Sequence, residues 1–364
     1  MSSLLNNTMS RTSHADLPLH YGRVPPWLAE RMTLLGGAIT EAILLEYGKS
    51  EVLKRLSDPL WFQAFGCVLG MDWHSSGITT SVMGALKRAI NPRSKDFGIY
   101  ICGGRGKHSL KTPDELLKVA EQTGLNGDAL VRSSRLVAKV DNTAIQDGFQ
   151  LYLHNFILTS EGEWVVVQQG LNDASGMARR YHWHSTQFQS YLDSPHAGVT
   201  GENQGLILNL ADNNAGITRN GIVRISAVQP DRMLSEIRKI VLPRHHEVMA
   251  SDVNMKRLGA VLTLAHEREV NNFESLLLLE GVGPRTVQSL TLVSEVIYGT
   301  PSRFTDPARF SFAHGGKDGH PFPVPLKVYD ETIEVLKTSV EKAKIGATDK
   351  QMAIRQLSVM AQHI

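Results

Sequence analysis

The sequence has little of what marks a secreted or membrane protein. Its 364 residues include two cysteines, Cys67 and Cys102, which excludes a disulfide framework and a cysteine-rich zinc site. No apolar run approaches the roughly 20 residues that cross a bilayer. Residues 1–16 are polar and lack the apolar core of a signal peptide, so we expect a flexible tail. These absences predict a cytoplasmic protein that does not contact a membrane.

The chain also lacks an excess of charge of one sign. Its 38 basic and 36 acidic residues give a formal charge of +2, so no field of the whole protein would draw it to nucleic acid. Any nucleic-acid surface must therefore be a local patch. By contrast, 42% of the residues are hydrophobic, which is enough for sizeable cores, and the length predicts two domains.

Hydrophobic periodicity changes near Gln229. Before this point, apolar residues first recur at helical spacing and then alternate with polar residues, which predicts strands at 97–101, 136–141, 150–158, 163–171, 205–213 and 222–230. After it the patterns are helical. We therefore predict an α+β protein. A mixed α/β domain with an antiparallel-rich sheet would span 17–229, and an all-helical domain would span 230–364.

The clearest motif lies at 272–298, NFESLLLLEGVGPRTVQSLTLVSEVIY. Asn272 can cap a first helix, and Pro284 suits the first turn of a second helix because it needs no amide there. Gly281 and Gly283 allow a turn with positive φ between them. Backbone amides at such a turn, together with the positive end of the second helix, suit a phosphate.

This segment resembles the helix-hairpin-helix motif of DNA repair proteins, which binds the DNA backbone without reading its sequence. The resemblance implies DNA as the partner, contacted by Gly281, Val282, Gly283, Arg285 and Thr286. The alternative interpretation is an ordinary helical hairpin with glycines at a tight corner.

Two other basic segments are candidates for binding nucleic acid. The loop GGRGKH, residues 103–108, offers Arg105 and Lys107 between an expected strand and an expected helix, although its glycine spacing completes no nucleotide-binding motif. The segment ARRYHWH, residues 178–184, interleaves Arg179 and Arg180 with aromatic residues, which suits phosphate pairing and base stacking. The alternatives are a plain basic loop and a surface strand.

Catalytic chemistry is expected first from acidic and histidine residues near the sheet. Asp72 and His74 stand two residues apart on a connection, where they could bind a metal or share a proton; a helix-capping network is the alternative. A second group could hold a divalent ion over a scissile phosphate, or could instead form a buried ion pair: Lys139, Asp141, Asp147 and His154.

A third candidate is the glycine-rich loop FAHGGKDGHP near the C-terminal end. It could present His314, Asp318 and His320 to a substrate or a metal. A solvated loop is the alternative.

A second resemblance rests on segments spread along the chain: RTSHADLPLHYGRVPPWLAERM, DPLWFQAFGCVLGMDWHSSGITTSVMGALKRA, GGRGKHSLKTPDEL, AKVDNTAIQDGFQLYLHNF, VVVQQGLN, ARRYHWHS and RFSFAHGGKDGHPFPV. Together they are similar to the prokaryotic domain-of-unknown-function family numbered 763, from about Arg11 to about Val340. This resemblance implies a shared architecture and no particular reaction.

The base-excision glycosylases that share the hairpin offer a comparison. Many of them carry a nucleophilic lysine two residues after the second hairpin glycine. That position is Arg285 here, and a guanidinium cannot form a Schiff base. Asp306 is close to the position of their catalytic aspartate but not on it.

We therefore expect a DNA-binding, DNA-processing protein, a repair-type nuclease or other hydrolase that uses Mg²⁺ or Mn²⁺. The candidate metal ligands are Asp72, His74, Asp141 and His154. Alternative functions are a monofunctional DNA glycosylase-like enzyme using Asp306, a non-catalytic DNA-binding or scaffold protein, and a small-molecule enzyme that binds a phosphate at the GGRGK loop.

Overall fold

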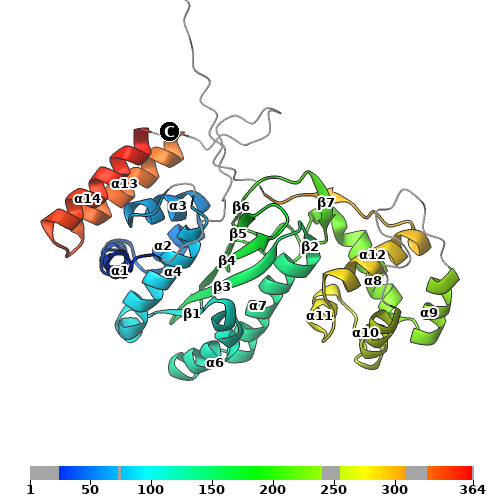
Figure 1. Ribbon diagram of the computed structural model, residues 1–364. Helices are drawn as coiled ribbons and strands as arrows, with labels where there is room; N and C mark the ends of the chain where they lie inside the picture. The colour runs from blue at the N-terminus through cyan, green and yellow to red at the C-terminus, as the bar shows by residue number, and fades with distance from the viewer. Residues whose placement is uncertain (1–23, 73–74, 240–254, 309–325, 363–364) are drawn as a thin grey trace, which may run out of the picture.

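The computed structural model describes residues 24–72, 75–239, 255–308 and 326–362 (Figure 1). Several predictions fall outside these ranges, namely those for the tail at 1–16, His74, His314, Asp318 and His320. No helix within the described ranges is both long enough and apolar enough to cross a membrane.

A five-stranded antiparallel sheet lies at the centre of the fold, with the order β1-β3-β4-β5-β6 (Figure 1). Its strands are β1 (Ile99–Arg105), β3 (Gln150–Thr159), β4 (Trp164–Asn172), β5 (Met177–His184) and β6 (Gly198–Thr200). A smaller sheet pairs β2 (Ile145–Gln146) with β7 (Leu206–Asn209), and β7 with β8 (Phe304–Thr305). The predicted α+β class and antiparallel-rich sheet are confirmed.

Both faces of the large sheet are buried, because its strands alternate apolar side chains between two cores. Ile157, Val165 and Val167 belong to the core on one face. Phe156 and Val166, their neighbours along the strands, belong to the core on the opposite face. The long apolar runs of β3 and β4 follow from this two-sided burial.

Helices from both ends of the chain cover the first face. They are α1 (Pro26–Tyr47), α2 (Lys49–Ser57), α3 (Pro59–Val68), α4 (Gly77–Ile90), α13 (Leu326–Lys342) and α14 (Ala347–Gln362); α5 (Ser94–Phe97) is a short turn before β1. Helix α13 packs on α1 and α14 on α3 (Figure 1). Leu336 and Leu357 thereby complete the core begun by the N-terminal helices.

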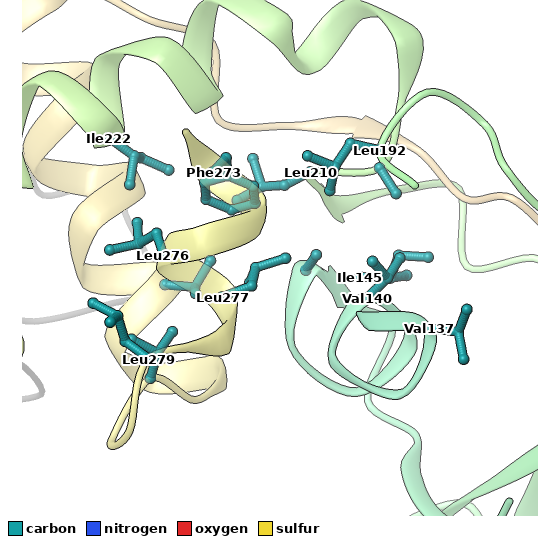
Figure 2. Packing of buried hydrophobic residues seen from close by; sticks show 14 of the residues in the cluster. Val137, Val140, Ile145, Leu192, Leu210, Ile222, Phe273, Leu276, Leu277 and Leu279 are labelled. Carbon is teal, nitrogen blue, oxygen red and sulfur yellow. The ribbon is translucent and has the colours of Figure 1, made fainter. Parts of the chain in front are cut away.

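The second face carries α6 (Thr112–Thr123) and α7 (Gly127–Lys139). Beside them lie α8 (Gly216–Ala227), α9 (Pro230–Lys239), α10 (Met255–Glu267), α11 (Phe273–Leu278) and α12 (Pro284–Tyr298). Leu276 and Leu277 of α11 belong to the same hydrophobic cluster as Val140 and Ile145, which follow α7 (Figure 2). The described residues 230–239 and 255–298 therefore share one hydrophobic core with the sheet rather than forming their own.

Two strand predictions were wrong. Residues 136–141 continue α7 into a π-helical turn, η3 (Val140–Ala144), and residues 222–227 belong to α8. In both segments the buried residues follow helical spacing: Leu136, Val137 and Val140 in the first, Ile222 and Ile225 in the second. Over so few residues an apolar run fits either period.

A glycine sets the close approach of α8 to α12. A Cβ at Gly221 would lie 2.1 Å from the Ser294 hydroxyl oxygen. Ser294 is buried and accepts a hydrogen bond from the Thr300 hydroxyl at 2.9 Å. The helices therefore cannot admit a methyl group here without separating.

We predict that Gly221→Ala lowers the free energy of unfolding by about 1–3 kcal/mol, since overpacking outweighs the helix propensity of alanine. Urea denaturation measures the change. Gly216→Ala is the matched control, because its Cβ would be 3.7 Å from the nearest side-chain atom and its φ is helical at −56°. A Gly221→Ala protein as stable as the control would contradict this account of the packing.

Candidate nucleic-acid interface and an adjoining Asp–His pair

The turn between α11 and α12 has most of the predicted local geometry, but Gly283 is extended with φ −143°. The Asn272 side chain accepts a hydrogen bond from the Ser275 amide at 2.8 Å and so caps α11. Gly281 has φ 81°, in the region that glycine enters without strain. Pro284 occupies the first turn of α12.

Side chains from other elements hold the carbonyl groups of this turn. Lys139, the last residue of α7, donates from Nζ to the Val282 oxygen, and Arg257 of α10 donates from Nε to the Gly281 oxygen at 3.1 Å. Gln146 donates to the Pro284 oxygen at 2.7 Å. These bonds fix the turn with its carbonyl oxygens toward α7, β2 and α10.

The first amides of α12 are left for another partner. Among the described residues, no side chain caps this helix. The N–H groups of Arg285 and Thr286 belong to the first turn, which has no intrahelical acceptor. The Arg285 side chain is exposed. The positive end of a 15-residue helix thus faces outward beside a guanidinium.

A groove of about 640 Å³ lies between this turn and α7. Arg135, Lys139 and Asn142 line one side, and residues 278–284 line the other. Burial, followed by the nearby charge of Arg257, lowers the pKa of Lys139. The charges of Lys139 and Arg257 disfavour each other, so an anion bound between them would be favourable.

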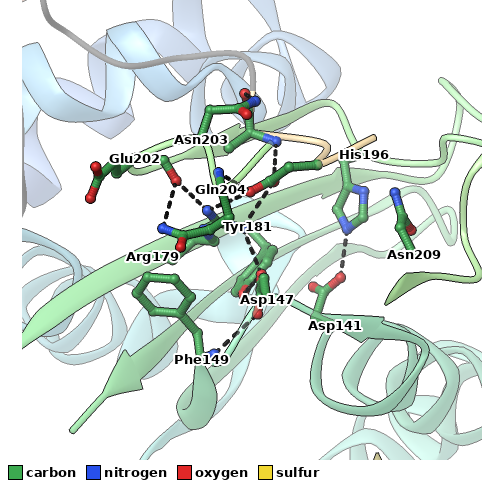
Figure 3. A network of polar contacts seen from close by, with 12 residues as sticks. Asp141, Asp147, Phe149, Arg179, Tyr181, His196, Glu202, Asn203, Gln204 and Asn209 are labelled. Carbon is green, nitrogen blue, oxygen red and sulfur yellow. Dashed lines mark hydrogen bonds and ion pairs between the residues drawn. The ribbon is translucent and has the colours of Figure 1, made fainter. Parts of the chain in front are cut away.

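The π-helical turn η3 connects this groove to a buried polar network. Lys139 and Asn142 line the groove, whereas Asp141 has no exposed side-chain surface. Its carboxylate accepts hydrogen bonds from the Trp183 indole at 2.8 Å and from His196 Nε2 at 2.5 Å (Figure 3). A Gln168 amide donates to the same group. π-helical turns are often found at functional sites.

The bond to Asp141 determines the tautomer of His196. A carboxylate accepts hydrogen bonds, so Nε2 carries the proton and Nδ1 of the neutral ring is an acceptor. His196 lines a cavity of about 170 Å³ together with Asn209, Asp212 and Ser194, and its ring lies between Asp141 and Asn209 (Figure 3). Ser194 has φ 49°, which is uncommon for a residue other than glycine.

His154 is buried on the other side of Gln168. Its Nδ1 donates to the Gln168 side-chain oxygen at 2.7 Å, and its Nε2 accepts from the Ser134 hydroxyl at 2.9 Å. Burial lowers the pKa of His154. Asp141 and His154 are therefore linked through Gln168 within the interior rather than across an open cleft.

Asp147 forms a separate buried ion cluster with Arg179 and Asp306. Arg179 donates to Asp147 at 2.8 Å (Figure 3). It also donates to both oxygens of Asp306 at 2.9 Å. Tyr181 donates to Asp147 at 2.7 Å. The backbone amides of Gln204, just before β7, and Ala308, just after β8, also donate to Asp306. This carboxylate therefore connects both segments with Arg179 on β5.

The prediction that Arg179 and Arg180 bind nucleic acid is corrected, because both side chains are buried with 0% of their surface exposed. Arg180 points to the opposite face, where it donates to the Gln63 side chain at 2.9 Å and lies over the Phe62 ring. Their strand is the fourth of five in the sheet order. Neither guanidinium can reach a bound nucleic acid in this arrangement.

The predicted catalytic residues do not form one cluster. Asp141 and His154 share a network, but Lys139 faces the hairpin groove and Asp147 is tied to Arg179. Asp72 is exposed on the connection between α3 and α4. Within the described ranges no group of three or more histidine, cysteine, aspartate or glutamate side chains could hold a metal ion.

The family comparison agrees with the second resemblance. A family model described as "Protein of unknown function (DUF763)" matches residues 13–324. The chain belongs to this family. No curated protein and no solved structure matches the chain. The match to DUF763 covers the glycine turn, Asp141 and His196, and it assigns none of them a role.

His196 was missed in the sequence of this DUF763 protein. It follows Ser194–Pro195 in a connection between β5 and β6, far along the chain from Asp141. Its one signal is a histidine beside a proline in a connection that the alternation pattern left unassigned. The contact of His196 with Asp141 depends on the packing of η3 against β5. Hydrophobic periodicity in the sequence does not predict this tertiary packing.

We predict that the stability of the protein falls as the pH drops below about 6.5, partly because of His154. Its pKa is lowered in the folded state, so the unfolded chain binds the proton first, and stability is retained above the unfolded pKa and lost below it. His154→Gln should make the slope of unfolding free energy against pH shallower between pH 7 and 5, by up to about 1.4 kcal/mol per pH unit. Urea unfolding at several pH values would refute this if both proteins gave the same slope.

Proposed function

We propose that this protein binds the phosphate backbone of DNA through the groove between α7 and the α11–α12 turn. The observation that carries the proposal is the arrangement of Lys139 and Arg257, which hold the carbonyl oxygens of Gly281 and Val282. The first turn of α12 begins at the same turn, with the exposed Arg285 beside it. Backbone amides, a helix N-terminus and clustered cations are together the usual donors to a DNA phosphate.

The local character of this charge supports the proposal. The chain carries a formal charge of only +2, so its attraction to a polyanion has to come from one surface. The resemblance to the helix-hairpin-helix motif points to the same surface. Contacts with the backbone would not distinguish base sequences.

We expect DNA binding that weakens steeply with salt, because cations that contact phosphates displace counterions. Arg285→Gln and Lys139→Met should each weaken binding and reduce the slope of log K against log salt by about one unit. Fluorescence anisotropy across a salt series measures both quantities. Lys118→Met, at an exposed position on α6, is the matched control. Absence of binding by the unmodified protein, or equal affinities for all variants, would eliminate the proposed interface.

A second candidate function, hydrolysis of nucleic acid, is favoured by the Asp141–His196 pair. The buried carboxylate would orient the imidazole, as in hydrolases that pair a base with an orienting acid. Nδ1 of His196 would accept a proton from water while the water oxygen attacks phosphorus. The bond from phosphorus to the leaving oxygen would break, and that oxygen would take a proton from solvent.

Asp306 is not included in this mechanism. Asp306 lines the same cavity as His196, but each of its oxygens already accepts one hydrogen bond from Arg179 and one from a backbone amide. The glycosylase-like alternative would therefore depend on a different carboxylate. A non-catalytic DNA-binding protein remains the other alternative.

We expect His196→Gln to reduce any cleavage of DNA by about 10²–10⁴-fold, the usual contribution of a general base, while DNA affinity is unchanged. Single-stranded, duplex and branched DNA should be assayed with and without Mg²⁺ or Mn²⁺. His266→Gln, an exposed histidine on α10, provides the control. Undiminished cleavage by His196→Gln would exclude this base, and no cleavage of any substrate by the unmodified protein would favour the non-catalytic alternative.

A further inference from the structure

The groove at the hairpin continues into two more cavities. A cavity of about 370 Å³ shares Arg135, Ala138 and Leu151 with the groove. A cavity of about 690 Å³ in turn shares Leu153 with the middle one. The three cavities therefore follow one another along the start of β3, from the α11–α12 turn to the glycine-rich loop at 103–108.

The charged side chains that line these cavities are predominantly basic. Among the described residues that line them, Glu280 is the one acidic side chain. The basic side chains are distributed along the full length: Lys139, Arg135, Arg105, His108, Arg88 and Lys87. Glu115 offsets part of this charge through its ion pair with Lys87 at 2.7 Å. Basic side chains spread over three successive cavities suit a long, linear polyanion better than one small anion.

An aromatic side chain lies where the middle and third cavities meet. Tyr152 lines the middle cavity, and the guanidinium of Arg105, from the third cavity, lies 5.7 Å from the centre of its ring. Tyrosine rings and arginine planes are the surfaces on which unpaired bases stack. Bases in a duplex are already stacked on one another, so this feature favours a single strand.

The third cavity contains a buried amide without a partner. Asn155 lines this cavity and is 2% exposed, and its Nδ2 donates to no other described residue. Leaving such a donor unpaired is unfavourable. A phosphate oxygen or a base carbonyl in the cavity would accept this hydrogen bond once the Asn155 side chain turns toward it, which is an indication of a ligand independent of the charge.

Glycines keep the third cavity open beneath the loop. Gly103 has φ 90°, and a Cβ there would lie 2.2 Å from the His154 carbonyl oxygen. Gly104 has φ 146°. Because only glycine accepts these conformations readily, the backbone can pass close under Arg105 and His108 without side chains filling the space.

We infer that the three cavities form one continuous track for a single strand of DNA, which would run from the α11–α12 turn across Tyr152 to the loop at 103–108. This inference rests on the proposed backbone binding at the hairpin. It adds the form of DNA and a second contact region that includes Arg105, His108 and Asn155. In this arrangement the basic loop at 103–108 and the α11–α12 turn bind the same DNA strand.

The test measures the affinity of oligothymidylates of increasing length by fluorescence anisotropy. The unmodified protein should bind more tightly as the strand lengthens, until the strand reaches the loop, after which affinity levels off. Arg105→Gln should lower the affinity for long strands about tenfold, as expected for loss of a stacking contact, and leave short strands unaffected. Lys118→Gln, outside the track, is the matched control.

The two proposals fail in different ways. If Arg285→Gln weakens binding but Arg105→Gln has no effect at any length, the hairpin interface stands and the track is refuted. Tighter binding of duplex than of long single strands, with equal dependence on Arg105, also refutes the single-strand track. No binding of any DNA removes both proposals.

A chemical footprint gives a second measurement. Leu110 lines the middle cavity and is 80% exposed, whereas Leu117 on α6 lies outside the track and is 41% exposed. Burial raises the pKa of both native thiols, Cys67 and Cys102, to about 12, so an introduced thiol reacts first. Long oligothymidylates should slow alkylation of Leu110→Cys but not of Leu117→Cys. Equal rates with and without DNA at Leu110→Cys would overturn the track.

Discussion

The buried carboxylate of Asp141 is the interaction on which the two candidate sites depend. It accepts hydrogen bonds from Gln168 on β4, Trp183 on β5 and His196 before β6. An uncompensated carboxylate in such a position would be strongly unfavourable, so these donors fix η3 against the sheet. Because η3 is fixed in this way, Lys139 lines the groove at the α11–α12 turn and His196 lines the neighbouring cavity. One residue thus positions both the groove and the Asp–His pair.

Much of the fold followed from local patterns in the sequence. Strands β3 and β4, the glycine turn and the Asn272 cap of α11 were predicted because each is set by neighbouring residues. The strands predicted at 136–141 and 222–230 were wrong because both segments are short apolar runs. Over so few residues, the apolar pattern of a buried helix cannot be distinguished from that of a buried strand. The packing of α13 on α1 could not be predicted, since no local signal specifies it.

The candidate site was harder to predict than the fold. Arg179 and Arg180 have the composition of a nucleic-acid surface, but their strand is covered on both faces, and composition does not report burial. Asp147 and Arg179 fit the alternative of a buried ion pair. His196 could be identified only from a tertiary contact. By contrast, Lys139 was identified as a candidate, although for a different role from the one its position at the turn now suggests.

The pairing of α13 and α14 with α1 and α3 has a consequence for biosynthesis. Leu336 and Leu357 complete a core whose other members include Met32 and Phe65, so residues near opposite ends of the chain must meet. A ribosome releases the N-terminal helices long before their partners exist, and such distant contacts are slow to form. The nascent chain will carry an exposed apolar surface until residues 326–362 have been synthesised, which makes the first helices a natural binding site for chaperones.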